Sequence, residues 1–112
     1  MATFFNIASH WKLKRKDARN LLGGLETKAY SRLTIEAEIT LKPDKLTRIS
    51  FLTGIFAALN RLHGEKIADK WVTLPNSNRI FGGRTPLDYM TRGGIPAMQT
   101  VRRLLDARSM RA

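Results

Sequence analysis

The spacing of apolar residues constrains the fold of this chain more than any other feature of its sequence. Between Pro43 and Gly64, apolar side chains recur every three or four residues, which is the repeat of one face of an α-helix. Proline is accepted in a first helical turn, and glycine is common just past a helix end. The spacing therefore predicts one long helix with a broad buried stripe. The stripe consists of Leu46, Ile49, Leu52, Ile55, Phe56, Leu59 and Leu62. Gly54 lies inside it despite costing up to about 1 kcal/mol in helix propensity, so we expect close helix packing there.

Shorter segments with the same period predict helices along most of the chain, which places it in the all-α class. The expected helices cover residues 4–11, 15–22, about 26–33, 65–74, about 86–92 and from 95 onward. In the helix at 65–74, we expect Ile67, Ala68, Trp71 and Val72 to face inward. One run, "RLTIEAEITL" at residues 32–41, alternates instead. It is compatible with a short strand, an extended linker, or a helix followed by a linker.

Two glycine pairs bracket the segment "GGRTPLDYMTRGG" at residues 82–94, as in a phosphate-cradling loop or a short capped helix. The segment lacks the lysine and the length of a phosphate loop. Thr85 offers an N-cap hydroxyl, Pro86 suits the first helical position, and Asp88 places a negative charge in the first turn. Gly93 and Gly94 then end the helix. The pattern predicts a short capped helix that turns the chain into the last helix.

The helices expected at residues 15–22 and about 26–33 are separated by Gly23 and Gly24. A helix, a glycine turn and a second helix form the outline of a helix-turn-helix, in which the second helix lies in the major groove of DNA. A plain helical hairpin that never meets DNA fits the same pattern. The candidate DNA contacts are basic and hydroxyl side chains: Lys14, Arg15, Lys16, Thr27, Lys28, Ser31 and Arg32.

The net charge favours a polyanionic partner. Twenty Lys and Arg face nine Asp and Glu, which gives +11, a balance typical of proteins that bind DNA, RNA, an acidic protein or an anionic membrane surface. A solvated basic face without a partner is the alternative. The chain has no cysteine, so neither a disulfide nor a thiolate metal site is available, and a cytoplasmic location is expected. We find no signal-peptide pattern and no apolar run long enough for a membrane span.

Residues suited to catalysis are few. His10 and His63 are the only histidines, and neither has a ligand partner at a spacing typical of metal sites. No serine lies in a nucleophile elbow, and no pair of acidic residues stands out as an acid–base dyad. We therefore expect no enzyme activity, no cofactor, no metal and no small-molecule substrate.

The segment "KWVTLPNSNRIFGGRTPLDYMTRGGIPAMQTVRRLLDA" resembles the toxin-binding domain of the Xre/MbcA/ParS antitoxin family. The shared pattern is a tryptophan, a Pro-Asn loop, a Gly-x-x-Pro step into a short helix, a glycine and a closing helix. "LTRISFLTGIFAALNRLHG" resembles the long helix before this pattern, and "HWKLKRKDARNLLGG" resembles the family's N-terminal segment. The residues that carry the C-terminal pattern are Trp71, Pro75, Asn76, Gly82 or Gly83, Pro86, Leu87, Gly93, Val101, Leu104 and Leu105.

This resemblance implies a helix-turn-helix-like N-terminal unit at residues 1–42, for dimerisation and DNA contact, and a small helical toxin-binding domain at residues 43–112. It implies an antitoxin of a type II toxin–antitoxin system. The partner would be a RES-domain toxin, an enzyme that consumes NAD, whose active-site pocket the antitoxin blocks without binding NAD itself. A homodimer within a larger complex with the toxin, and operator DNA bound for autoregulation, are further expectations.

The residues expected to contact the toxin combine members of the motif with charged residues of the last helices. They are Trp71, Asn76, Arg84, Pro86, Leu87, Arg92, Arg102, Arg103, Asp106, Arg108 and Arg111. A Cro-like helix-turn-helix usually has a small residue four positions before the turn glycine, where this chain has Arg19 or Asn20, so DNA contact through basic residues is better supported than base reading. Two alternatives stay open: a helix-turn-helix transcriptional regulator without a toxin partner, and a nucleic-acid-binding structural or membrane-surface protein.

Overall fold

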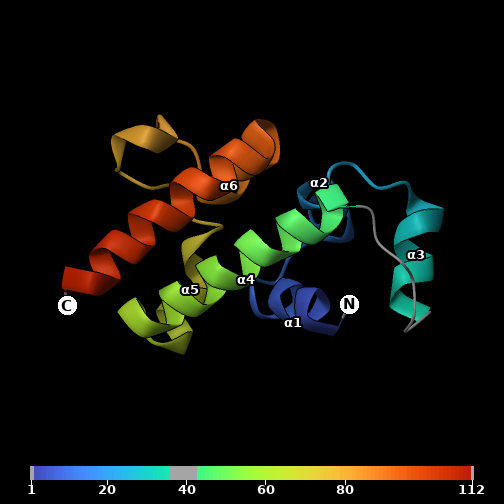
Figure 1. The fold of residues 1–112 in the computed structure, drawn as a ribbon, viewed down its shortest axis with the longest axis horizontal. Coiled ribbons are helices and arrows are strands. Elements are labelled where there is room, and N and C mark those ends of the chain that lie inside the picture. Colours follow the sequence, from blue (N-terminus) through green and yellow to red (C-terminus); the bar gives the residue numbers. More distant parts are fainter. Residues whose placement is uncertain (1, 36–42, 112) are drawn as a thin grey trace.

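The computed structural model describes residues 2–35 and 43–111, and within them it contains helices and no strand, which confirms the all-α prediction (Figure 1). The elements are α1 (Ala2–His10), α2 (Arg15–Leu21), α3 (Thr27–Ile35), α4 (Pro43–His63), α5 (Glu65–Trp71), the short 3-10 helix η1 (Arg79–Phe81) and α6 (Pro86–Arg111). In the described part of the chain, no helix has the length and apolarity to cross a membrane. Of the alternating run at 32–41, the first four residues end α3, and the remainder lies outside the described residues.

Helix α4 forms the centre of the molecule, with α6 along one side and α1 and α5 on the other (Figure 1). Its buried residues are Leu52, Ile55, Ala58 and Leu59. Three members of the predicted stripe therefore lie in the core together with Ala58, and Ile49, Phe56 and Leu62 are partly buried against it. Burying a leucine or isoleucine side chain contributes about 1.5–3 kcal/mol to the stability of the fold. This face is therefore a large source of stability. The largest side chains packed around it are Phe4, Ile7, Trp11, Leu21, Leu22, Phe81, Met90, Met98 and Leu105.

Two residues predicted to face inward are exposed instead. Leu46, in the first turns of α4, keeps 54% of its surface accessible, and Ile67 on α5 keeps 59%. Both predictions were wrong because the helical period defines an apolar stripe but does not say how far a neighbouring helix covers it. Trp71, also expected inward, is half-buried, whereas Ala68 and Val72 are fully buried.

The close packing expected at Gly54 is present, and its partner is Arg102 of α6. A methyl group placed on Gly54 would lie only 2.4–2.6 Å from atoms of the Arg102 guanidinium. The guanidinium therefore rests against the backbone of α4 at the one position in this stripe without a side chain. The neighbouring turn adds a polar contact, since Arg102 Nε lies 3.5 Å from Asp106 Oδ2.

The glycine-bracketed segment forms the predicted capped helix and then breaks. The backbone N–H of Asp88 donates a hydrogen bond to Thr85 Oγ1 at 3.0 Å, as in an N-cap. Within α6, Gly94 has non-helical angles of φ 65° and ψ −147°, which separate the short helix from the last one. A methyl group on Gly93 would lie 2.5 Å from the Ala97 Cβ, so position 93 has no room for a side chain. Position 94 needs glycine because of its left-handed backbone conformation.

Helices α1 and α2 end in the same hydrogen-bond pattern with different residues. The N–H groups of Lys12 and Leu13 donate to the carbonyls of Ser9 and Ala8, and those of Gly23 and Gly24 donate to the corresponding carbonyls of α2. This is the Schellman motif, which places its central residue in the left-handed region and normally uses glycine. Gly23 follows that rule, whereas Lys12 adopts φ 53° as a non-glycine residue.

Helix α3 extends from the body at the edge of the molecule (Figure 1). Its buried residue Tyr30 packs edge-on against Phe5 of α1, with ring centroids 5.5 Å apart. The chain between α2 and α3 spans residues 22–26 and contains the two glycines that the sequence placed at a turn. A pair of helices joined by a glycine turn is therefore present, which the helix-turn-helix outline and the plain helical hairpin both predict.

The cap of α6 makes a direct prediction about stability. Replacing Thr85 with alanine removes the acceptor for the Asp88 N–H, so Thr85→Ala should lower the free energy of unfolding by about 1 kcal/mol. Chemical denaturation followed by circular dichroism measures the change. Thr100→Ala is the matched control, because its hydroxyl only bonds back to the Pro96 carbonyl of the same helix and should change stability by less than about 0.5 kcal/mol. Equal losses in both variants would contradict the cap.

Candidate partner-binding surfaces

The loop between α5 and α6 is shaped by the residues of the C-terminal sequence motif. Asn76 Oδ1 accepts the Asn78 N–H at 2.9 Å, and Asn78 Oδ1 accepts the Ile80 N–H at 3.1 Å. These two turns lead into η1, whose Phe81 is fully buried. The Leu87 N–H donates to the Val72 carbonyl at 2.9 Å, which fixes the start of α6 against the end of α5.

Aromatic rings fill the space under this loop. Trp71 meets Phe81 edge-on at 5.8 Å between ring centroids, and Phe81 meets Tyr89 in the same way at 5.3 Å. Such pairs contribute about 0.5–1.5 kcal/mol beyond the area they bury. Four residues expected to contact a toxin therefore hold the loop in place: Trp71, Asn76, Leu87 and the buried Pro86.

The charged residues that were expected to contact a toxin divide into two groups. Arg84, Arg92, Arg103 and Arg108 are exposed, although Arg92 pairs with Asp88 on its own helix at 3.0 Å. Arg102 lies against Gly54, and Asp106 lies between Arg102 and Arg61 of α4, 3.9 Å from the latter. The second group holds α6 on α4, whereas the first group faces outward. The side chain of Arg111 lies outside the described part of the structure.

A comparison with protein-family models finds a match in the C-terminal part of the chain. Residues 58–109 match the model of the antitoxin Xre/MbcA/ParS C-terminal toxin-binding domain. This segment is therefore similar to an Xre/MbcA/ParS toxin-binding domain. The resemblance expected from the sequence is thereby confirmed over the end of α4, α5, the loop and nearly all of α6. No curated protein and no solved structure matches the chain significantly.

The residues expected to contact DNA lie on α2, on α3 and just before α2. Lys14, Arg15, Lys16, Thr27, Lys28 and Arg32 are exposed, and Ser31 is half-buried. Arg15 contacts the Ser31 hydroxyl, and its guanidinium lies 5.4 Å from the centre of the Tyr30 ring. Arg19 donates to the Thr27 hydroxyl at 2.7 Å. Two of the candidates on α3 thus take part in fastening it to α2.

Arg48 of α4 was not singled out by the sequence, and it connects three elements. Its Nη1 donates to the Leu21 carbonyl at the end of α2 at 3.3 Å, and its Nε donates to Asp44 at 3.0 Å. A methyl group on Gly94, at the break in α6, would lie 3.5 Å from its Nη2. The hydrogen bond from Arg48 holds the pKa of the Asp44 carboxyl below its ordinary value of 3.8, with smaller contributions from the charges of Arg48 and Lys45.

The sequence offered His10 no ligand partner at a spacing typical of metal sites, yet the fold brings two carboxylates to its ring. Its Nδ1 lies 3.2 Å from Asp69 Oδ2 and 3.7 Å from Glu65 Oε1. Both acidic residues are on α5, more than 50 positions along the chain. Local spacing carries no signal for contacts at such separations, so sequence reasoning had no means of finding this cluster.

The lowered pKa of Asp44 makes a prediction about pH. A carboxyl with a lowered pKa in the folded state adds stability above its unfolded pKa and loses it as pH falls through the folded pKa. Asp44→Asn should therefore destabilise the chain near neutral pH, and its unfolding midpoint should converge with that of the wild type in acid. The measurement is urea denaturation across pH. In an Arg48→Met background, Asp44→Asn should have a smaller effect; an undiminished effect would contradict the contact.

Proposed function

We propose that this chain is the antitoxin of a type II toxin–antitoxin system and neutralises a RES-domain toxin that consumes NAD. The observation that carries the proposal is the toxin-binding domain at residues 58–109. The C-terminal half of α6 enters or covers the active-site pocket of the toxin and excludes its substrate. The chain acts as a homodimer in the cytoplasm and has no catalytic role of its own.

The distribution of charge on α6 supports this mode of inhibition. Arg103 and Arg108 are exposed, and neither forms an ion pair with any residue in the described ranges. Groups that bind the negative pyrophosphate of NAD would repel a guanidinium, so we place the arginine contacts at carboxylates and carbonyls on the rim of the pocket. A guanidinium donates planar, paired hydrogen bonds to carboxylates and carbonyls, and the unpaired arginines of α6 are available for such contacts.

A second activity, binding of operator DNA, is supported by a separate surface. Lys14, Arg15 and Lys16 are exposed at the start of α2, and Lys28 and Arg32 are exposed on α3, in a chain with net charge +11. A dimer would present this surface twice, as expected for an operator with two half-sites. If no toxin binds the chain, the alternative of a DNA-binding regulator without a toxin partner becomes the better account.

Mutating the two surfaces separately tests the toxin contact. The double variant Arg103→Ala/Arg108→Ala should bind the RES-domain toxin at least about a hundredfold more weakly, because each of the two lost hydrogen bonds to a charged group contributes about 1.5–3 kcal/mol. Calorimetric titration measures the affinity. Lys14→Gln/Lys16→Gln also removes two exposed charges and serves as the control, with unchanged toxin affinity. Equal affinity of all three proteins for the toxin would contradict the proposed role of these arginines.

DNA binding should depend steeply on salt. The logarithm of the binding constant for operator DNA should fall by roughly 0.9 per logarithmic unit of salt for each phosphate contact. Lys14→Gln/Lys16→Gln should lower this slope by up to about two such contacts, whereas Arg103→Ala/Arg108→Ala should leave it unchanged. Fluorescence anisotropy with labelled duplex provides the measurement. Absence of binding at low salt would remove this activity and leave toxin neutralisation untouched.

A further inference from the structure

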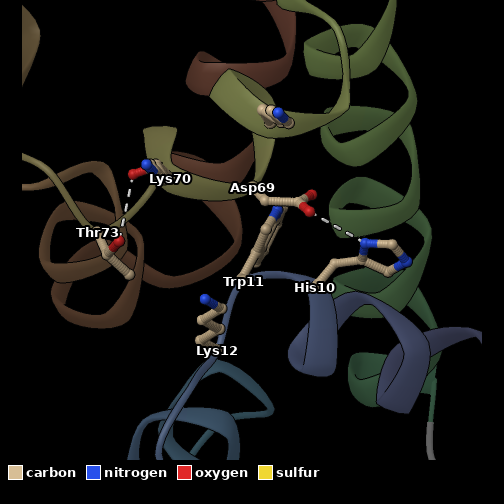
Figure 2. A pocket seen from close by; sticks show the side chains of 7 residues that line it. His10, Trp11, Lys12, Asp69, Lys70 and Thr73 are labelled. Carbon is tan, nitrogen blue, oxygen red and sulfur yellow. Dashed lines mark hydrogen bonds and ion pairs between the residues drawn. The ribbon is translucent and has the colours of Figure 1, made fainter.

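A pocket of about 380 Å³ lies where the end of α1 meets α5, and His10, Trp11 and Asp69 line it (Figure 2). His10 is the last residue of α1. Glu65 and Asp69 are four positions apart on α5, so both carboxylates stand on one face of that helix. The side chains come from two elements that the chain brings together only by folding.

The three side chains offer ligand atoms at distances suited to a single metal ion. His10 Nδ1, one oxygen of Glu65 and one of Asp69 all lie within 4.8 Å of one another. His10 Nδ1 is 3.2 Å from Asp69 Oδ2 and 3.7 Å from Glu65 Oε1. Bonds of about 2.0–2.2 Å to zinc place the ligands of a tetrahedral site about 3.3–3.6 Å apart. The His10–Asp69 and His10–Glu65 separations are therefore already close to the ligand separations of a tetrahedral zinc site.

Two buried polar atoms next to the cluster have no hydrogen-bond partner. Asp69 Oδ1 is buried and has no hydrogen-bond partner, so its contact with His10 satisfies only half of the carboxylate. The indole Nε1 of Trp11 is also buried without a partner, and Trp11 is only 1% exposed. Ligating carboxylates commonly keep their second oxygen hydrogen-bonded to a neighbouring donor. Trp11 lines the same pocket and has an unused N–H donor, which is not bonded to Asp69 Oδ1 in this structure.

We propose that His10, Glu65 and Asp69 bind one Zn²⁺ ion, with water completing the tetrahedron. The imidazole nitrogen favours Zn²⁺ over Mg²⁺ or Ca²⁺, which prefer shells made of oxygen. The ion would join the end of α1 to α5, and so tie the N-terminal helices to the toxin-binding domain. The ammonium groups of Lys12, Lys66 and Lys70 around the pocket oppose a cation, so substituting Lys66 with Gln should strengthen binding. Binding of Zn²⁺ at this site requires neither the toxin nor DNA, so it can be tested on the chain alone.

Titration of the full, metal-free chain with Zn²⁺ tests the proposal. We expect one ion per chain by calorimetry, a rise in melting temperature with Zn²⁺ concentration, and no binding of Mg²⁺. Co²⁺ should give the strong visible absorption of a tetrahedral site. Glu65→Gln is the variant least able to disturb folding, because the Glu65 side chain is 72% exposed, and it should weaken Zn²⁺ binding at least tenfold.

The other histidine provides the matched control. His63 is exposed at the end of α4, so His63→Gln should bind Zn²⁺ as the wild type does, whereas His10→Gln should lose binding while remaining folded by circular dichroism. The proposal is overturned if the wild type shows no saturable binding, if Glu65→Gln binds Zn²⁺ with unchanged affinity, or if His63→Gln loses as much affinity as His10→Gln.

Discussion

The apolar face of α4 is the surface on which the other helices depend. Leu52, Ile55 and Leu59 are fully buried there, and truncating a buried leucine or isoleucine to alanine typically costs 2–5 kcal/mol. Helices α1, α5 and α6 cover this face from different sides. The residue without a side chain, Gly54, lets α6 bring Arg102 against the α4 backbone. Loss of this packing would release the last helix, which carries the proposed contacts with the toxin.

The residues that the sequence assigned to toxin contact have different roles in the fold. Trp71, Asn76 and Leu87 form the loop that starts α6, and Arg102 and Asp106 hold α6 in place. The exposed arginines are what a partner can reach. In this chain the motif residues therefore build a platform, and a partner would be recognised by the exposed charged residues carried on that platform.

Much of this arrangement follows from local rules that a sequence displays. The helical period identified α4 and three of its buried residues, and the residue types at Thr85 and Gly94 indicated the boundaries of the two parts of α6. These features depend on neighbours within four or five positions. The exposure of Leu46 and Ile67 could not be predicted, because it depends on where other helices end. The contacts of Arg48 and His10 join residues that are far apart in sequence, for which spacing holds no information.

The central claim, that the chain neutralises an NAD-consuming toxin, can be tested by one assay. The reading frame beside the gene of this chain is searched for a RES-domain protein, which is purified alone and in complex with this chain, and the rate of NAD loss is followed for both. The account predicts that a stoichiometric amount of this chain abolishes NAD consumption and that the two proteins elute together. Undiminished NAD consumption in the presence of a folded excess of the chain would contradict the account.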